Sequence, residues 1–188
     1  MVKVAIAYHS TYGHTAAQAE AVKRGVEQVE GVEVALIKVT EIENNWKLLH
    51  EADAIIFGCP TYMGSGSAEF KKFIELTAKF WTQQTWKDKL AAGFTNSGSQ
   101  SGDKLNTLVQ LAIFAAQQSM IWVSLGLLPG NNSSKGSVND INRLGAWMGA
   151  MAQSNVDQGP DVVPPANDLE TASLLGKRVA ELAVRFKK

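Results

Sequence analysis

Short apolar runs alternate with segments of helical periodicity along most of the chain. Apolar runs that stop at small polar residues predict strands buried on both faces. They span 3–8, 32–39, 52–58, 89–97 and 120–126. Segments with apolar residues three and four positions apart predict amphipathic helices. These span 15–29, 67–81, 103–118 and 168–186.

Strand and helix in alternation predict an α/β fold with a parallel sheet, because parallel neighbours need long right-handed connections. Five strands favour a flavodoxin-like, doubly wound sheet of order 2-1-3-4-5 with helices on both faces. Asp168 is expected to cap the last helix. Residues 127–167, rich in Gly, Asn, Ser and Pro, break the alternation and predict an insertion before that helix. The whole chain, 1–188, is expected to form one domain.

The balance of charged residues argues against two classes of binding partner. The 188 residues carry 18 basic and 18 acidic side chains, so no overall charge draws the chain to nucleic acid or to an anionic membrane. No window approaches the ~20 apolar residues of a membrane span. The single Cys59 and three scattered His give no metal-ligand spacing and fit a reducing compartment, so we expect a cytoplasmic protein without a metal.

Three loops of small polar residues follow predicted strands one, three and four. Their sequences are "HSTYGHT", "PTYMGSGS" and "TNSGSQSGD". In a doubly wound sheet, all three lie at the carboxyl ends of parallel strands, where such folds bind ligands. We therefore expect them to converge on one crevice.

The first loop has the composition of a phosphate cradle. Ser10, Thr11 and Thr15 offer hydroxyls, Gly13 allows close approach of the backbone, and the following helix presents unpaired N–H groups. The loop contains no Lys or Arg and neither of the glycine motifs that bind polyphosphates, which favours a monophosphate. Tyr62 and Met63 in the second loop offer flat or polarizable cover for a ring. Together the loops predict FMN.

These segments resemble a known family. "STYGHT", "FGCPTYMGSGSAEFKKFIELTAKFW" and "FTNSGSQSGD" look like the three flavin loops of the flavodoxin-like NAD(P)H:quinone oxidoreductases, the WrbA-like group named as tryptophan repressor-binding proteins. The similarity extends through the tail and covers nearly the whole chain. It implies a homo-oligomeric enzyme that moves hydride from NAD(P)H through FMN to a quinone in two-electron steps.

The resemblance also implies roles for individual residues. The first loop would hold the FMN phosphate, with Tyr12 also near the nicotinamide. Trp81 would line the substrate pocket, and Gln117 matches a position that reaches a flavin in a neighbouring subunit. The residues expected at FMN are Ser10, Thr11, Tyr12, Gly13, His14, Thr15, Pro60, Thr61, Tyr62, Met63, Gly64, Asn96, Ser97, Gly98, Ser99, Gln100 and Ser101.

Two positions depart from the family pattern. Tyr62 stands where the family has Arg, which removes a cation beside the ring. Gln117 and Gln118 replace a pair of His, and a Gln can donate a hydrogen bond but cannot titrate near neutral pH. These departures bear on the flavin potential, the nucleotide preference and the choice of quinone.

Several conspicuous side chains have plainer interpretations. His14 either faces the ligand or packs at the helix start, whereas His9 and His50 are expected to be structural and Cys59 a core residue. Trp46 and Trp122 are expected to pack in the core, and Trp147 and Met148 to help the insertion close the site. The loops contain no acid/base pair or nucleophile, which suits chemistry carried by a cofactor. A flavodoxin-like electron carrier and a non-catalytic FMN-binding protein remain the alternatives.

Overall fold

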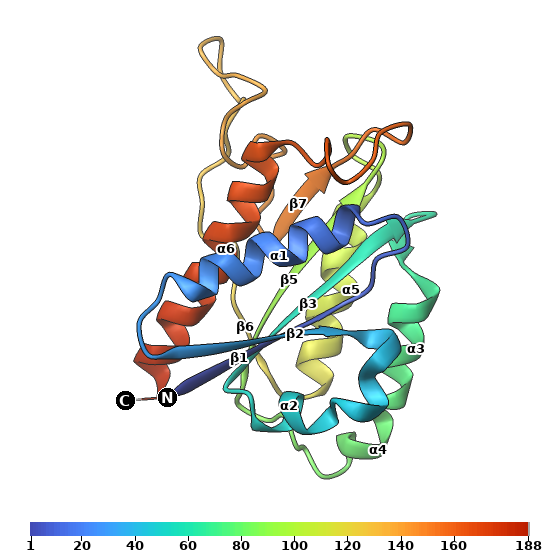
Figure 1. The fold of residues 1–188 in the computed structure, drawn as a ribbon, viewed down its shortest axis with the longest axis vertical. Helices are drawn as coiled ribbons and strands as arrows, with labels where there is room; N and C mark the ends of the chain where they lie inside the picture. The colour runs from blue at the N-terminus through green and yellow to red at the C-terminus, as the bar shows by residue number, and fades with distance from the viewer. Residues whose placement is uncertain (188) are drawn as a thin grey trace.

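A parallel sheet of order β2-β1-β3-β5-β6 runs through the molecule, in a computed structural model that describes residues 1–187 (Figure 1). This confirms the predicted order 2-1-3-4-5, because β4 is only a two-residue strand that pairs antiparallel with the end of β3. The strands are β1 Val2–Tyr8, β2 Val32–Lys38, β3 Ala54–Tyr62, β4 Ser65–Gly66, β5 Leu90–Ser97, β6 Ile121–Trp122 and β7 Ala150–Gln153.

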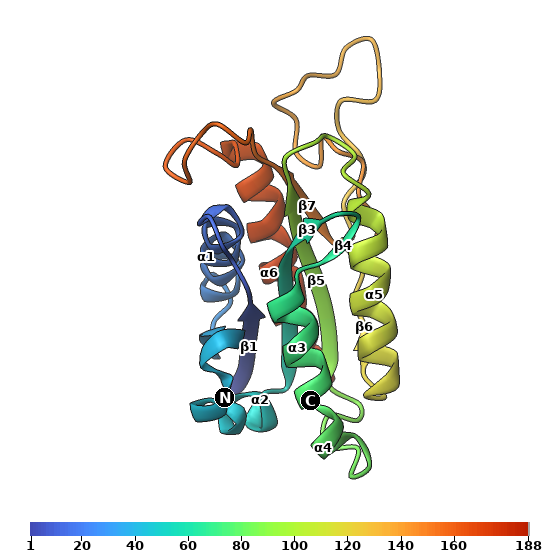
Figure 2. The ribbon, with the colours of Figure 1, turned by 90° about the vertical axis from the view of Figure 1, so that its right-hand side faces the viewer.

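Helices cover both faces of the sheet, as predicted. Figure 2 shows α1 and α6 on one face and α3 and α5 on the other. The helical segments are α1 His14–Glu27, η1 Val39–Asn44, α2 Trp46–Glu51, α3 Ala68–Leu76, α4 Ala78–Trp81, α5 Lys104–Gln117 and α6 Ala166–Phe186. Among residues 1–187, none of the helices combines the length and apolar character needed to cross a bilayer.

Each face of the sheet has its own apolar core. Ile6 of β1 packs with Val22 of α1 and Val179 of α6 on one side. On the other side Phe57 of β3 packs with aromatic and aliphatic residues of α3 and α5, including Phe73 and Leu108. The strands point side chains to both cores, which explains why they read as continuous apolar runs rather than alternating ones.

Two glycines allow α1 and α6 to lie against each other. A Cβ at Gly25 would overlap the Ser173 carbonyl, and a Cβ at Gly176 would overlap the Val22 carbonyl. The backbones of the two helices therefore approach more closely than any other side chain would permit. This contact fixes the position of α1, whose first residues form part of the candidate site described below.

The fifth position of the sheet differs from the prediction. We expected one strand over 120–126 with the insertion after it, but β6 pairs only with the start of β5 and β7 pairs with its end, at Phe94–Ser97. β6 ends at Trp122, Gly126 beyond it has a left-handed φ of 71°, and the chain returns to the sheet at Ala150. The insertion thus interrupts the fifth strand, and its last part forms β7.

Two helix boundaries also differ. The predicted helix 67–81 ends its first part at Thr77, whose hydroxyl donates to the Ile74 carbonyl (2.6 Å), and restarts as α4. The last helix begins at Ala166 rather than after Asp168, and Pro165 occupies the capping position. Asp168 lies in the first helical turn, and its carboxylate pairs with Arg143 instead of capping the helix.

Candidate functional site

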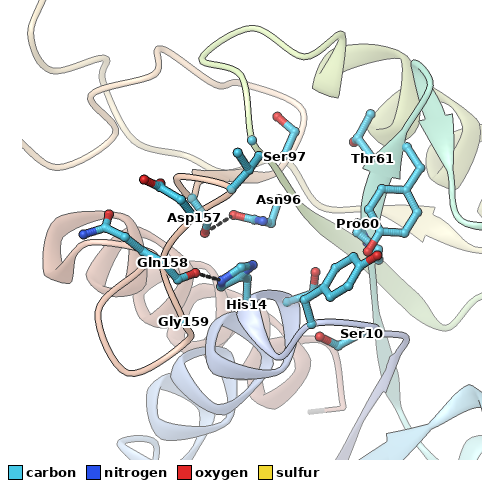
Figure 3. Close-up of a pocket in the computed structure, with 15 residues that line it drawn as sticks. Ser10, His14, Pro60, Thr61, Asn96, Ser97, Asp157, Gln158 and Gly159 are labelled. Atoms are coloured by element: carbon cyan, nitrogen blue, oxygen red, sulfur yellow. Dashed lines mark hydrogen bonds between the residues drawn. The ribbon is translucent and has the colours of Figure 1, made fainter.

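A cavity of about 750 Å³ opens at the carboxyl edge of the sheet (Figure 3). The three polar loops meet there, as expected from their places after β1, β3 and β5. They contribute Ser10, Tyr12, His14, Thr15, Pro60, Thr61, Tyr62, Asn96, Ser97 and Gly98. Residues 154–159, which follow β7, form a further wall that the sequence interpretation did not identify.

Other expected site residues lie outside this lining. Thr11 and Gly13 face a smaller hollow on the far side of the first loop. Met63 is fully exposed, so it does not cover the cavity. Gln100 and Ser101 line a second cavity, of about 840 Å³, between α5 and the insertion. Gly64 and Ser99 are also absent from the lining of the main cavity.

The first loop begins α1 in the way an anion site requires. Gly13 has a left-handed φ of 93°, and its N–H donates to Ser10 Oγ (3.1 Å), which holds the turn. No side chain caps α1, so the N–H groups of its first turn have no partner within the helix. These donors, the positive end of the helix dipole and the hydroxyl of Ser10 suit a phosphate.

His14 joins this loop to the segment after β7. Its Nε2 lies 2.8 Å from the carbonyl oxygen of Gln158, shown as a dashed line in Figure 3. A Cβ at Gly13 would press on the ring of Pro160, so the loop packs closely against this segment. One nitrogen of His14 is therefore engaged by the protein, which assigns His14 a structural contact and leaves Nδ1 for any contact with a ligand.

Thr61 belongs to a buried chain of hydroxyls. Its Oγ1 lies 2.7 Å from Thr95 Oγ1 and 2.8 Å from Thr107 Oγ1, and Thr95 donates to the Cys59 carbonyl (2.7 Å). The Thr61 hydroxyl is thus engaged within the protein. This hydroxyl joins β3, β5 and α5, while Thr61 also lines the cavity, so its contact with the cofactor stays a prediction.

Two tyrosines from different loops meet at the cavity. The rings of Tyr12 and Tyr62 pack edge to face, with centroids 6.5 Å apart. Tyr12 is 70% exposed and Tyr62 is 38% exposed, so both keep surface for a ligand. An aromatic pair of this kind suits a flat ring more than a second phosphate.

The neighbouring His9 and Cys59 have structural roles, as expected. His9 Nδ1 lies 2.8 Å from Ser67 Oγ, and burial lowers the pKa of His9 while Glu69 opposes this shift. Cys59 is fully buried, and its burial raises the pKa of the thiol to about 12. The thiol is therefore protonated at neutral pH and is a poor nucleophile.

The third loop, residues 97–101, turns its carbonyl oxygens toward the protein. Lys104 Nζ donates to the carbonyls of Ser99 (3.0 Å) and Gln100 (2.8 Å). The remaining bonds run from Ser154 N to Ser97 O (3.0 Å), from Gln153 Nε2 to Gly98 O (2.8 Å) and from Lys104 N to Ser101 O (3.1 Å). The N–H groups of residues 98–101 donate no hydrogen bond within residues 1–187. This loop therefore keeps donors for the carbonyls and ring nitrogens of a heterocycle.

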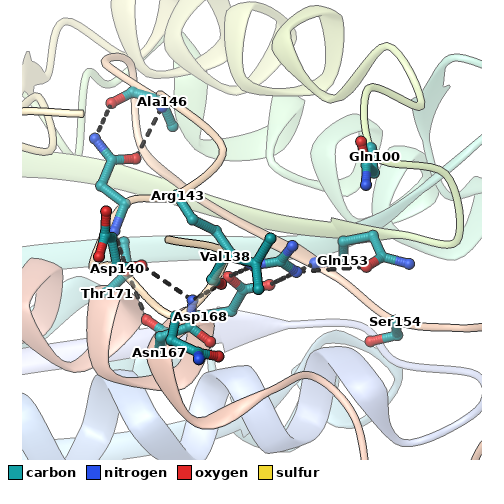
Figure 4. Close-up of polar contacts among 12 residues, drawn as sticks. Gln100, Val138, Asp140, Arg143, Ala146, Gln153, Ser154, Asn167, Asp168 and Thr171 are labelled. Atoms are coloured by element: carbon teal, nitrogen blue, oxygen red, sulfur yellow. Dashed lines mark hydrogen bonds and ion pairs between the residues drawn. The ribbon is translucent and has the colours of Figure 1, made fainter. Parts of the chain in front are cut away.

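The wall after β7 is held by a polar network (Figure 4). Arg143 Nε and Nη2 donate to the two carboxylate oxygens of Asp168 (both 2.8 Å), and Gln153 N donates to the same carboxylate (2.9 Å). Ser154 Oγ in turn lies 2.9 Å from the side-chain amide of Asn96, at the end of β5 that leads into the third loop. The insertion, α6 and the third loop are thus joined behind the cavity.

Trp81 and Gln117 lie away from the cavity of their own chain. Trp81 ends α4, at the opposite end of the sheet from the three loops (Figures 1 and 2). Its Nε1 donates to the Gln117 carbonyl (2.9 Å), and it is half exposed. The expectation that Trp81 lines the pocket is therefore wrong within one chain, because α3 and α4 run from the carboxyl edge toward the other end.

Trp147 and Met148 do not close the main cavity either. Trp147 lines the second cavity beside Leu105 and Asn106 of α5. The Met148 carbonyl accepts a hydrogen bond from Trp122 Nε1 (3.0 Å), which ties the insertion to β6. The insertion does contribute a wall to the main cavity, but through residues 154–159.

Comparison with known proteins identifies the family. Residues 3–129, which hold all three loops, match the family described as NADPH-dependent FMN reductase. The chain belongs to this family. The match ends before residues 154–159, so the wall after β7 lies beyond the matched part.

Relatives of this chain are named as flavodoxins or as NAD(P)H dehydrogenases (quinone). Flavodoxin FldP of Pseudomonas aeruginosa is 43% identical over 187 residues, which cover 97% of both chains. An NAD(P)H dehydrogenase (quinone) of Geotalea uraniireducens is 31% identical over 207 residues, covering 98% of this chain and 99% of its own. The crystal structure of a flavodoxin, WrbA-like protein from Agrobacterium tumefaciens is 40% identical, with a TM-score of 0.77 and coverage of 98% and 99%.

Proposed function

We propose that this protein is an FMN-dependent oxidoreductase that takes hydride from NAD(P)H and delivers it to a quinone-type acceptor. The observation that carries the proposal is the meeting of three donor-rich loops at one cavity, headed by the uncapped start of α1. Membership of the NADPH-dependent FMN reductase family and full-length similarity to quinone dehydrogenases support it.

The donors at the cavity fit FMN, a cofactor that accepts and donates hydride at its ring. Ser10 and the first N–H groups of α1 would hold the phosphate through neutral donors. Tyr12 and Tyr62 would contact the ring, and the N–H groups of residues 98–101 would be available to its oxygen and nitrogen acceptors. Residues 154–159 cover the site from the side of α6 and limit the entry of water.

The substrates share the exposed mouth of the same site. Tyr12 presents most of its ring to solvent, where a nicotinamide or a quinone can stack on it. Tyr62 lies beside Tyr12 and makes this part of the mouth aromatic, while Asp157 places a carboxylate on the opposite wall. Because hydride transfer is carried by the cofactor, the task of these residues is to position the two rings rather than to supply an acid or a base.

An electron carrier of the flavodoxin type is the second candidate, favoured by the 43% identity with Flavodoxin FldP. A carrier docks on a redox protein, commonly through a charged face, whereas this chain has a net charge of zero. A non-catalytic FMN-binding protein is the third candidate for the same cavity. The three candidates differ in whether they catalyse repeated oxidation of NAD(P)H by a quinone.

One experiment separates them. The purified chain is loaded with FMN, and oxidation of NADH and of NADPH is followed with and without benzoquinone. An enzyme oxidises the nucleotide in multiple turnovers only when quinone is present. Bound FMN without nucleotide oxidation supports a carrier if a redox protein then reduces it, and a binding protein if none does. A chain that binds no FMN contradicts all three.

We further infer a homo-oligomer, supported by the resemblance stated for Gln117. Trp81 and Gln117 form one hydrogen-bonded feature at the end of the sheet remote from their own cavity, so they contribute to catalysis only if a second copy brings them to its site. Light scattering gives the subunit number, and a Trp81→Ala variant that keeps FMN but loses quinone turnover supports this role. The lone buried Cys59 suits a reducing compartment, and we propose the cytoplasm.

A further inference from the structure

Lys104, the first residue of α5, buries its ammonium group behind the third loop. Only 1% of this residue is exposed. Its Nζ donates to Ser97 Oγ (2.7 Å), to the Ser99 carbonyl (3.0 Å) and to the Gln100 carbonyl (2.8 Å). Since an ammonium has three donors, all of them are engaged, and all by uncharged oxygens.

No carboxylate touches this cation within residues 1–187. Asp168 is the acidic group that acts on Lys104 from α6, but both of its oxygens already bond Arg143. The three buried or nearly buried charges behind the loop are thus two cations and one anion. Burial lowers the pKa of Lys104 to about 8, with Asp168 raising it and Arg143 lowering it, so the group is charged at neutral pH.

The cation lies one side chain away from the cavity. Ser97, which accepts the shortest bond from Lys104, lines the cavity itself. No Lys or Arg is among the residues that line it, whereas Asp157 contributes a carboxylate. Lys104 therefore supplies a positive charge to a site whose lining has none.

We propose that Lys104 is a positioning residue for FMN. Lys104 holds the third loop so that the N–H groups of that loop stay unpaired and available to the cofactor, and the charge of Lys104 favours the reduced cofactor. A hydride that leaves NAD(P)H for FMN carries two electrons and one proton, and it adds one negative charge to the cofactor. A buried cation near the ring stabilises that added charge, and the low dielectric of the interior strengthens the effect. This inference rests on the proposed use of FMN.

The test compares Lys104→Met, which removes the charge, with Lys104→Arg, which keeps it. Dissociation constants for oxidised FMN come from fluorescence titration, and midpoint potentials come from spectroelectrochemistry. We expect Lys104→Met to weaken binding of reduced FMN about tenfold more than binding of oxidised FMN, because a unit charge still acts at about 10 Å in a protein. A tenfold change in this ratio lowers a two-electron potential by about 30 mV. Lys104→Arg should retain most of the potential.

Lys71→Met is the matched control, because Lys71 is an exposed lysine of α3 paired with Glu75. It should leave both quantities unchanged. A folded Lys104→Met protein, checked by circular dichroism, whose potential equals that of Lys71→Met overturns the inference. If the wild-type chain binds no FMN, the proposed function fails instead.

A measurement on the wild-type chain covers the case in which Lys104→Met does not fold. Reduced FMN favours the charged form of Lys104, so reduction raises its affinity for a proton. The midpoint potential of the wild type should therefore fall more steeply with pH between about 8 and 9.5 than that of Lys104→Arg, whose guanidinium stays charged throughout this range. Equal slopes in the two proteins over this range contradict the proposal. Asp168 and Arg143, the charged groups that act on Lys104, form a buried ion pair with each other.

Discussion

The Nε2 atom of His14 lies 2.8 Å from the carbonyl oxygen of Gln158, although the two residues are 144 positions apart. The bond joins the start of α1 to the segment that walls the cavity on the α6 side. Gly13 and Pro160 pack beside it. The phosphate cradle and the wall are therefore one structural unit, and loosening the wall should loosen the cradle.

His14→Ala should weaken FMN binding about fivefold, because a net hydrogen bond contributes about 1 kcal/mol. Amide exchange of residues 154–159 should become faster in the same variant. Gln158→Ala is the control, because the acceptor is the main-chain carbonyl and survives the change. Equal FMN affinity in wild type and His14→Ala, with unchanged exchange, would show that the bond does not order the site.

The sequence predicted most of the sheet because its strands are continuous apolar runs and its helices have a clear apolar face. It did not predict β7. The run "AMAQ" is four residues long and takes its place only by pairing with the end of β5, more than 50 positions earlier. Short strands of this kind are defined by tertiary contacts rather than by local pattern.

The same limit applies to the site. The loops were predictable because the carboxyl ends of parallel strands share one edge. Residues 154–159 and the His14 contact depend on how the insertion folds back, which no local motif encodes. The sequence does place Lys104 on the buried face of α5. Thr107, Leu108 and Leu111 follow it at the helical spacing of three, four and seven residues. Because lysine is rarely buried, this spacing alone does not predict that its ammonium group lies in the interior.

Arg143→Ala should lower the free energy of unfolding by about 3 kcal/mol. The pair with Asp168 is nearly inaccessible, with side-chain exposures of 10% and 2%, and removing the Arg leaves a buried carboxylate without its partner. Urea unfolding measures the loss. Glu75→Ala, which breaks the exposed pair with Lys71, should cost less than about 0.5 kcal/mol. Similar losses in the two variants would contradict the importance of burial here.

Gly176→Ala should destabilise the protein by several kcal/mol, of the order seen for overpacked cores or more, since a Cβ would overlap the Val22 carbonyl of α1. Backbone atoms cannot yield as a flexible side chain can. Gly31→Ala is the comparison: Gly31 has a φ of 77° and no atom within 4 Å of a Cβ, so only the left-handed strain of about 1 kcal/mol applies. In thermal unfolding, Gly176→Ala should lose more stability than Gly31→Ala. A larger loss in Gly31→Ala would refute the importance of the contact between α1 and α6.

The stability of the folded chain should rise with pH between about 8 and 10 through Lys104. Its ordinary pKa is 10.5, and burial lowers the folded value to about 8. Between these values the unfolded chain binds more protons than the folded one, so the free energy of unfolding increases with pH. The penalty of holding the buried cation is present in full below about pH 8 and is lost as the pH approaches 10.5.

The titration of Lys104 can raise the free energy of unfolding by at most about 3.4 kcal/mol, because each unit of difference between the folded and unfolded pKa corresponds to about 1.36 kcal/mol. Urea unfolding of wild type and Lys104→Met at pH 7, 8, 9 and 10 isolates it, because the other titrating groups, including Lys89 with its lowered pKa, are common to both proteins. The free energy of unfolding of wild type should gain on that of the variant above pH 8. A difference between the two that is independent of pH would mean that Lys104 titrates at its ordinary value, and that the three oxygens around its ammonium fully replace water.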